Sequence, residues 1–146
     1  MTRQDVTDEI VAAMTARDIT FGEVAGKLGK PKMWTAAALL GQHPIAKADA
    51  EALVDLLGLR DASVRVLTQV PTRGALEEAV PSDPTMYRFY EVLQVYGPAI
   101  KALIHEEFGD GIMSAIAFNM DLEREEHEAG DRVKITMSGK FLPYSW

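Results

Sequence analysis

Residues 83–97 constrain the fold more than any other segment, because their polar residues fall on one stripe of a predicted helix. Thr85, Arg88, Glu91 and Gln94 recur at every third position, and side chains at that spacing lie on one helix face. Most of the remaining positions are apolar, namely Met86, Tyr87, Phe89, Tyr90, Val92, Leu93, Val95 and Tyr96. A helix that is apolar almost all round is predicted to be buried.

The charged stripe then needs a partner, because a buried charge without one is very costly. A partner charge, a second subunit or a polar cavity would each meet that need. Arg88 and Glu91 together in a buried wet pocket suggest a site for a small anion. An ion pair within the helix is the commoner explanation for this spacing, and such pairs contribute only about 0.2–0.5 kcal/mol. The apolar surroundings of the pair weigh against that explanation.

The composition is that of an ordinary soluble globular chain, with 146 residues, 47% of them hydrophobic and 25% charged. The absence of cysteine excludes disulfides, thiolate nucleophiles and thiolate metal sites. Residues 1–9 lack a basic start followed by an apolar run, and no apolar stretch approaches the length of a membrane span. We therefore expect a cytoplasmic protein with no membrane association.

The net charge of −7 argues against nucleic acid as the main partner, because neutralising phosphates requires a basic face. Residues 1–80 hold nine Lys and Arg against eleven Asp and Glu, whereas residues 81–146 hold six against eleven. An acidic chain that binds anions must concentrate its few cations locally.

The first half of the chain is predicted to be helical. Thr20 can cap a helix that Gly29 ends, and Pro31 can begin the next, which runs to Leu40. Two short helices joined by such a tight turn form a helix-turn-helix. The predicted helices cover residues 2–16, 21–28, 31–40, 46–57 and 61–70.

The second half is predicted to combine helices with a hairpin. The segment 71–82 has the Pro and Gly content of a linker, which places the domain boundary between residues 80 and 81. Gly97 is predicted to end the striped helix, and Pro98 to begin a last helix through Phe108. Alternating residues then predict two strands, over 112–122 and around 133–137, joined by 123–131.

The predicted fold is therefore mainly α, with a repressor-like helical bundle over residues 1–80 and a small α+β domain over 81–146. One hairpin and two helices bury too little surface to stand alone. We therefore expect the α+β domain to mediate oligomerisation, with a second subunit completing its apolar helix and sheet edges.

Several motifs closely resemble those of the cyanate hydratase (cyanase) family. The longest is the signature-like run over residues 83–97, DPTMYRFYEVLQVYG. The other matching segments lie at 35–42, 71–74, 101–106, 108–112, 114–116 and 139–143, so the resemblance covers essentially the whole chain. Departures are confined to a short N-terminus, the acidic loop around 125–128 and the tail 144–146.

The resemblance implies bicarbonate-dependent decomposition of cyanate to ammonia and carbon dioxide through carbamate. The family's three catalytic residues match Arg88, Glu91 and Ser114. The resemblance also implies a homodecamer of five dimers with sites between subunits. No metal or cofactor is implied, because bicarbonate is a co-substrate and itself the nucleophile.

These residue types suit a reaction between two anions. Arg88 provides a permanent charge and a planar fork that can grip an oxyanion with two hydrogen bonds. Glu91 could orient that fork or relay a proton, and the sequence leaves both roles open. Ser114 offers a hydroxyl and a backbone amide as anion donors, although a serine at a strand start is usually a turn residue. The three histidines, at 43, 105 and 127, lack the spacing of metal ligands.

A helix-turn-helix DNA-binding regulator is the alternative from another class. Its recognition helix would present Trp34 and Thr35 followed by three alanines, with cations only at Lys30 and Lys32. Base edges are read mainly by Arg, Lys, Asn and Gln, so this helix is poorly suited to DNA. A purely structural assembly protein is a third possibility, but it leaves the Arg88 and Glu91 stripe unexplained.

Overall fold

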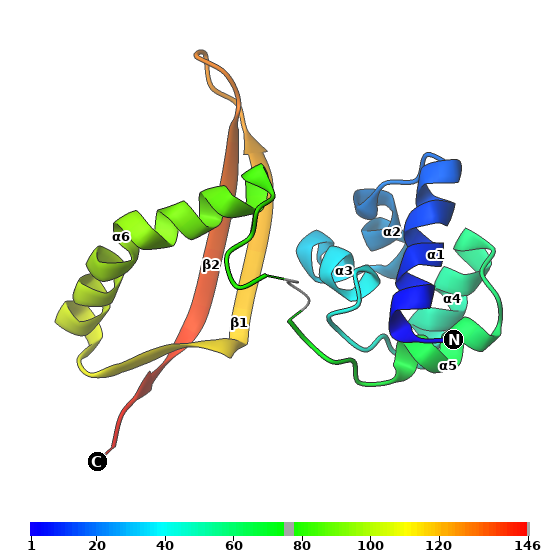
Figure 1. Cartoon of the computed structure of the whole chain (residues 1–146), viewed down its shortest axis with the longest axis horizontal. Coiled ribbons are helices and arrows are strands. Elements are labelled where there is room, and N and C mark those ends of the chain that lie inside the picture. Colours follow the sequence, from blue (N-terminus) through cyan, green and yellow to red (C-terminus); the bar gives the residue numbers. More distant parts are fainter. Residues whose placement is uncertain (75–77, 146) are drawn as a thin grey trace. The chain divides into compact units, whose positions relative to one another are not determined.

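The computed structural model describes residues 1–74 and 78–145 and contains five short helices, one long helix and a two-stranded sheet within them (Figure 1). The chain divides into two units with a boundary after Gly74, and residues 120–136 of the hairpin group with the first unit. The predicted linker, 71–82, lies partly outside the described residues. The elements are α1 (Arg3–Ala16), α2 (Phe21–Leu28), α3 (Lys32–Leu39), α4 (Lys47–Leu57), α5 (Ala62–Thr68), α6 (Pro84–Phe108), β1 (Gly111–Glu125) and β2 (Arg132–Pro143).

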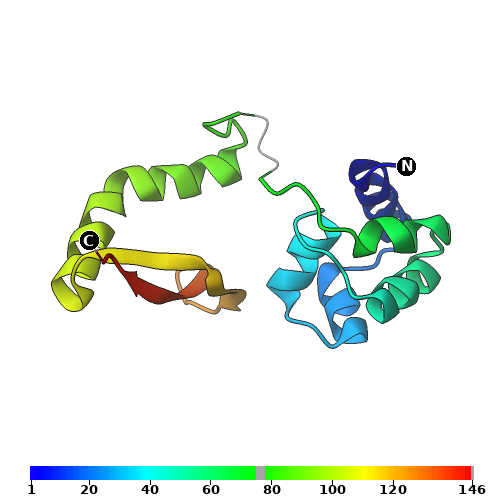
Figure 2. The same ribbon diagram turned by 90° about the horizontal axis from the view of Figure 1, so that it is seen from below.

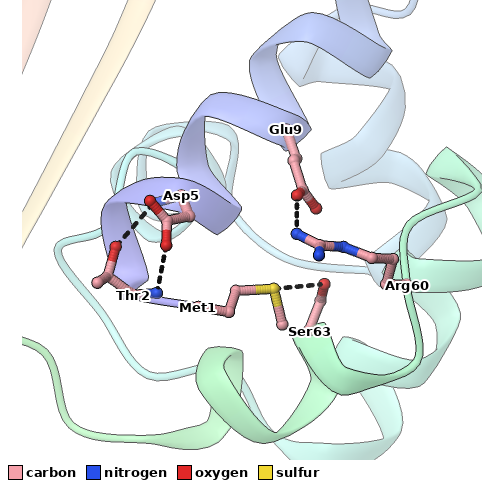
Figure 3. Close-up of polar contacts among 6 residues, drawn as sticks. All are labelled: Met1, Thr2, Asp5, Glu9, Arg60 and Ser63. Carbon is pink, nitrogen blue, oxygen red and sulfur yellow. Dashed lines mark hydrogen bonds and ion pairs between the residues drawn. The ribbon is translucent and has the colours of Figure 1, made fainter.

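Side-chain caps set the start of the first two helices. The Thr2 hydroxyl accepts from the Asp5 amide at the start of α1, and the Asp5 carboxylate accepts from the Thr2 amide (Figure 3). Thr20 and Glu23 form the same reciprocal pair at α2. These bonds satisfy amides that otherwise lack a partner in the first turn, and they lower the pKa of both carboxyl groups.

The helix-turn-helix predicted in the first half is confirmed. Gly29 ends α2 with a φ of 63°, a left-handed conformation that glycine adopts without strain, and Pro31 precedes α3. Gly58 ends α4 in the same way. Helix α2 packs against α3 and α4, and α5 packs against α1 and α4.

One hydrophobic core joins these five helices. Each helix contributes apolar residues at helical spacing, as Val6, Ile10 and Met14 do in α1. Two polar contacts add to the packing of α1 against the chain around α5: Arg60 pairs with Glu9, and the Ser63 hydroxyl donates to the Met1 sulfur at 3.9 Å (Figure 3). The buried core comprises Val6, Ile10, Met14, Val24, Ala38, Leu39, Ile45, Ala50, Leu53, Val54, Leu57 and Leu67.

The prediction that Gly97 ends a helix and Pro98 begins another is wrong, because α6 continues through both residues as one 25-residue helix. Proline removes one amide donor from the helix, but its fixed φ is itself helical. The residue before a proline resists the helical conformation partly because its Cβ clashes with the ring, and Gly97 has no Cβ. Helix α6 bends along its length, as expected for a proline-containing helix (Figures 1 and 2).

The hairpin follows α6 immediately. Gly109 ends the helix with a φ of 89°, and β1 begins at Gly111, one residue before the predicted start. Both strands are longer than predicted, so the connection shortens to residues 126–131. Two ion pairs lie at the extended ends of the strands: Arg124 of β1 contacts Asp131 of the connection at 3.2 Å, and Lys134 of β2 contacts Glu123 of β1 at 3.1 Å.

Within a single chain, α6 is not buried, which differs from the prediction for the striped helix. No described residue of α6 is buried, and more than half of the surface of Leu93, Val95 and Tyr96 is exposed. No helix in the described residues combines the length and hydropathy that crossing a membrane requires.

Candidate active site

Arg88 and Glu91 lie on the first turns of α6. The Asp83 carboxylate caps this helix by accepting from the amides of Thr85 and Met86, each at 2.9 Å. The Arg88 Nη1 donates to Glu91 Oε2 at 2.9 Å, so the helix forms the ion pair that its spacing allows. The Arg88 side chain is 65% exposed and that of Glu91 47% exposed, so this pair alone contributes little to stability.

The guanidinium of Arg88 keeps donors for a ligand. Its central carbon lies 5.8 Å from the ring centre of Tyr87, a cation–π distance that supports the plane of the group from one side. Among the described residues, Glu91 is the only acceptor that Arg88 contacts by a hydrogen bond. A guanidinium has five N–H donors, so the remaining ones can hold an anion in two-pronged geometry.

Ser114 lies on β1 and is only 6% exposed. Its hydroxyl oxygen accepts from the backbone amides of Ile116 and Ala117, both at 3.0 Å. A regular strand does not bring those two amides to one side chain, so β1 is locally bent here. The sequence predicted Ser114 as a donor, and the structure adds that its oxygen is already an acceptor twice.

The structure brings two of the three predicted residues together. Arg88 and Glu91 are in contact, whereas no hydrogen bond or ion pair joins Ser114 to either of them in the described part of the chain. All three belong to the same unit. A single chain therefore contains all three predicted residues, but the described part of the chain shows no hydrogen bond or ion pair between Ser114 and the other two.

Sequence reasoning missed the relation between Gly139 and Ser114. A Cβ atom added at Gly139 of β2 would lie 2.4 Å from the Ser114 carbonyl oxygen. The available signal was a glycine inside a strand, which often marks a close approach of two backbones.

The three histidines make local contacts with neighbouring side chains and backbone. His43 stacks on Trp34 with ring centres 5.9 Å apart, His105 contacts Lys101 and the Gly109 carbonyl, and His127 accepts from the Ala129 amide. Burial, and secondly the charge of Arg73, lower the pKa of His43. No group of three or more acidic or histidine side chains that could hold a metal occurs in residues 1–74 and 78–145.

Comparison with protein families identifies both halves of the chain. Residues 3–71 match the family model for the N-terminal part of cyanate hydratase, and residues 78–146 match that for the cyanate lyase C-terminal domain. The chain belongs to the cyanate hydratase family. The family that the motifs predicted is thereby confirmed.

Individual members of the cyanate hydratase family are similar to this protein over nearly its whole length. The cyanate hydratase of Mycolicibacterium vanbaalenii is 61% identical over 146 residues, which cover all of this chain and 95% of that protein. The cyanate hydratase of Methylibium petroleiphilum is 54% identical over 144 residues, covering 99% of this chain and 98% of the other. The crystal structure of cyanase from T. urticae superposes with a TM-score of 0.83 at 36% identity, covering 94% of this chain and 96% of the other. The predicted fold class is confirmed.

Proposed function

We propose that this chain is a cytoplasmic enzyme that decomposes cyanate to ammonia and carbon dioxide with bicarbonate as the second reactant. The observation that carries the proposal is the match of both halves of the chain to cyanate hydratases, with relatives above 50% identity over nearly the whole sequence. The chemistry of the Arg88 and Glu91 pair is consistent with anionic reactants.

The proposed reaction begins when a bicarbonate oxygen attacks the cyanate carbon and forms a C–O bond. The bicarbonate proton passes to the cyanate nitrogen, so the adduct keeps two negative charges in total until a second proton reaches the nitrogen. The bond between the former bicarbonate carbon and the new bridging oxygen then breaks, carbon dioxide leaves, and the electron pair stays on that oxygen. The product is carbamate, which takes up a proton and separates into ammonia and carbon dioxide without further catalysis.

Arg88 and Ser114 are proposed to hold the two anions. Two unit charges 4 Å apart repel by about 4 kcal/mol at an effective dielectric constant of 20, so the reactants need a fixed cation and directed donors. The guanidinium supplies both, because it stays protonated and presents parallel N–H groups. The Ser114 hydroxyl adds a donor at a buried position.

Glu91 has two possible roles in this scheme. Its contact with Arg88 Nη1 at 2.9 Å supports an orienting role, because the bond fixes the rotation of the guanidinium plane. Protonation of the adduct is the other role, and it would require Glu91 to exchange a proton during turnover. No metal or organic cofactor enters either version of the mechanism.

The active form is proposed to be a homo-oligomer, a decamer of five dimers with its sites between subunits. Apolar side chains that a stable monomer would bury lie open on α6 and β1, and Ile116 is 97% exposed. Covering α6 with another copy would also bury its charged stripe next to apolar surface, where Arg88 attracts an anion more strongly than it does in water.

Bicarbonate dependence tests the proposed function. In carbon dioxide-free buffer, we expect the initial rate of ammonia release from cyanate to be close to that of a protein-free blank. The rate should then accelerate, because the product carbon dioxide hydrates to bicarbonate, and added bicarbonate should abolish the lag. A full initial rate without bicarbonate would contradict the mechanism.

We also expect no sequence-selective DNA binding. In α3 the side chains of Thr35, Ala38 and Leu39 are buried, so the helix has little left with which to read base edges. A mobility-shift assay at physiological salt should show no defined complex. Tight binding that weakens steeply with salt would favour the regulator instead.

A further inference from the structure

The hydroxyl of Ser114 is restricted to one chemical role by its own backbone. A serine oxygen has two lone pairs and one proton. Both lone pairs are engaged here, because the amides of Ile116 and Ala117 donate to the oxygen at 3.0 Å each. The proton is the part left for a ligand, and two N–H bonds to the oxygen strengthen it as a donor.

This arrangement depends on a local irregularity in β1. Side chains of a regular strand alternate between its faces, so buried positions are two residues apart. In β1 the buried positions are Gly111 and Ser114, which are three residues apart. The strand is bent just after Ser114, as in a bulge. The bend turns the Ile116 and Ala117 amides toward the Ser114 oxygen.

Gly139 on the neighbouring strand leaves room for this bend. A Cβ at that position would lie 2.4 Å from the Ser114 carbonyl oxygen and 2.5 Å from Met113 Cγ. Gly139 has no positive φ, so glycine is required here for space and not for backbone conformation. A flexible side chain such as that of Met113 could move away, but the Ser114 carbonyl could move only with its peptide.

We propose that Gly139 is a positioning residue for Ser114. The space that Gly139 leaves allows the Ser114 hydroxyl to point its proton at the anionic reactants. The inference rests on the proposed function, in which Ser114 binds those reactants. Any side chain at 139 displaces the Ser114 peptide, breaks the paired amide bonds to its oxygen and turns the hydroxyl proton away from the ligand.

The test compares Gly139→Ala with a matched glycine substitution. Misplacing a catalytic group by about 1 Å can cost about 100-fold in rate, so we expect kcat/KM for cyanate to fall about 100-fold in Gly139→Ala. Gly26→Ala is the control, because Gly26 also lacks a positive φ and a Cβ there would meet nothing within 4 Å. The control should keep the rate and the oligomeric state of the unaltered protein.

A double-substitution cycle separates positioning from general damage to the hairpin. Malonate, a small dianion, serves as the probe, and its dissociation constant is measured by calorimetry. Ser114→Ala and Gly139→Ala should each weaken malonate binding by about tenfold or more, the value of one hydrogen bond to a charged group. The double variant should bind no more weakly than Ser114→Ala alone, because Gly139 acts through Ser114. If the double variant loses malonate affinity by the product of the two single losses, the inference is overturned.

A second variant covers the possibility that Gly139→Ala fails to assemble. Met113→Ala combined with Gly139→Ala removes one of the two clashes and keeps that with the Ser114 carbonyl. Persistent loss of activity in this assembled variant supports positioning. Recovery would assign the effect to Met113 packing, and failure of both variants to assemble would assign Gly139 to folding, so either outcome overturns the inference.

The activity measurements also distinguish this inference from the proposed function. An unaltered protein with no bicarbonate-dependent activity would overturn both. An active unaltered protein with an equally active Gly139→Ala variant would overturn the positioning role alone.

Discussion

Arg88→Lys is expected to lower kcat/KM for cyanate by at least about 100-fold while leaving the protein assembled. Removing one directed donor from a site that stabilises developing negative charge costs about 100- to 1000-fold in rate. Lysine keeps the positive charge but loses the planar fork, and its shorter reach also breaks the fixed contact with Glu91. Steady-state kinetics measures the loss of kcat/KM, and light scattering shows whether the variant remains assembled.

Arg124→Lys is the matched control, because Arg124 also forms an exposed ion pair, with Asp131 at 3.2 Å. That pair lies near the hairpin turn, away from the predicted site residues in the sequence. The activity of the Arg124→Lys variant should therefore equal that of the unaltered protein. Near-normal catalysis by Arg88→Lys would show that the charge alone is sufficient and that the two-pronged grip is unnecessary.

Mixing two inactive variants is expected to restore about a quarter of the sites. Arg88→Ala and Ser114→Ala should each be nearly inactive, since each removes a group that is proposed to hold an anion. In this structure no hydrogen bond joins Arg88 or Glu91 to Ser114 among the described residues, in agreement with sites built from two chains. After joint denaturation and refolding, random pairing leaves about one site in four with both residues intact.

The control for this experiment is each variant, and the unaltered protein, refolded alone by the same procedure. Activity of the mixture near a quarter of the refolded unaltered protein supports shared sites. If one chain supplies both residues, no mixture contains a complete site, so an assembled but inactive mixture would exclude sharing.

The helices of the first half were predictable because their signals are local. Thr20 and Gly29 begin and end α2 through bonds to amides and carbonyls within a turn of themselves. Such capping depends on neighbouring residues alone, so one sequence is enough to find it. The spacing of apolar residues in α1 likewise follows from the helix itself.

Helix α6 was harder to predict because two local signals conflict with its continuation. Gly97 and Pro98 together usually separate helices, but here glycine removes the steric obstacle that proline creates, and strong helix formers such as Ala99 and Ala102 follow. The exposure of this helix in a single chain differs from the burial that its apolar positions predict. That pattern indicates that a surface covers the helix, but it does not say whether the surface belongs to the same chain.

At the candidate site, the contact between Arg88 and Glu91 was predictable and the geometry around Ser114 was not. The three-residue spacing of Arg88 and Glu91 is enough to place them in contact on a helix, and they are. The acceptor bonds of Ser114 depend on a bend in β1, and the room for that bend depends on Gly139, 25 positions along the chain. Contacts between strands depend on register, which alternation alone does not specify.

In the proposed homo-oligomer, the stability of the protein depends on its concentration, because the apolar surface of α6 is exposed in a single chain. A subunit that gains its cover only from other copies is stabilised by mass action, so the melting temperature rises with protein concentration and dilution favours unfolding. Refolding then includes a step that is second order in subunits, during which exposed α6 surfaces can also meet incorrectly. Preparations compared at different dilutions would therefore differ in active fraction even when their sequences are identical.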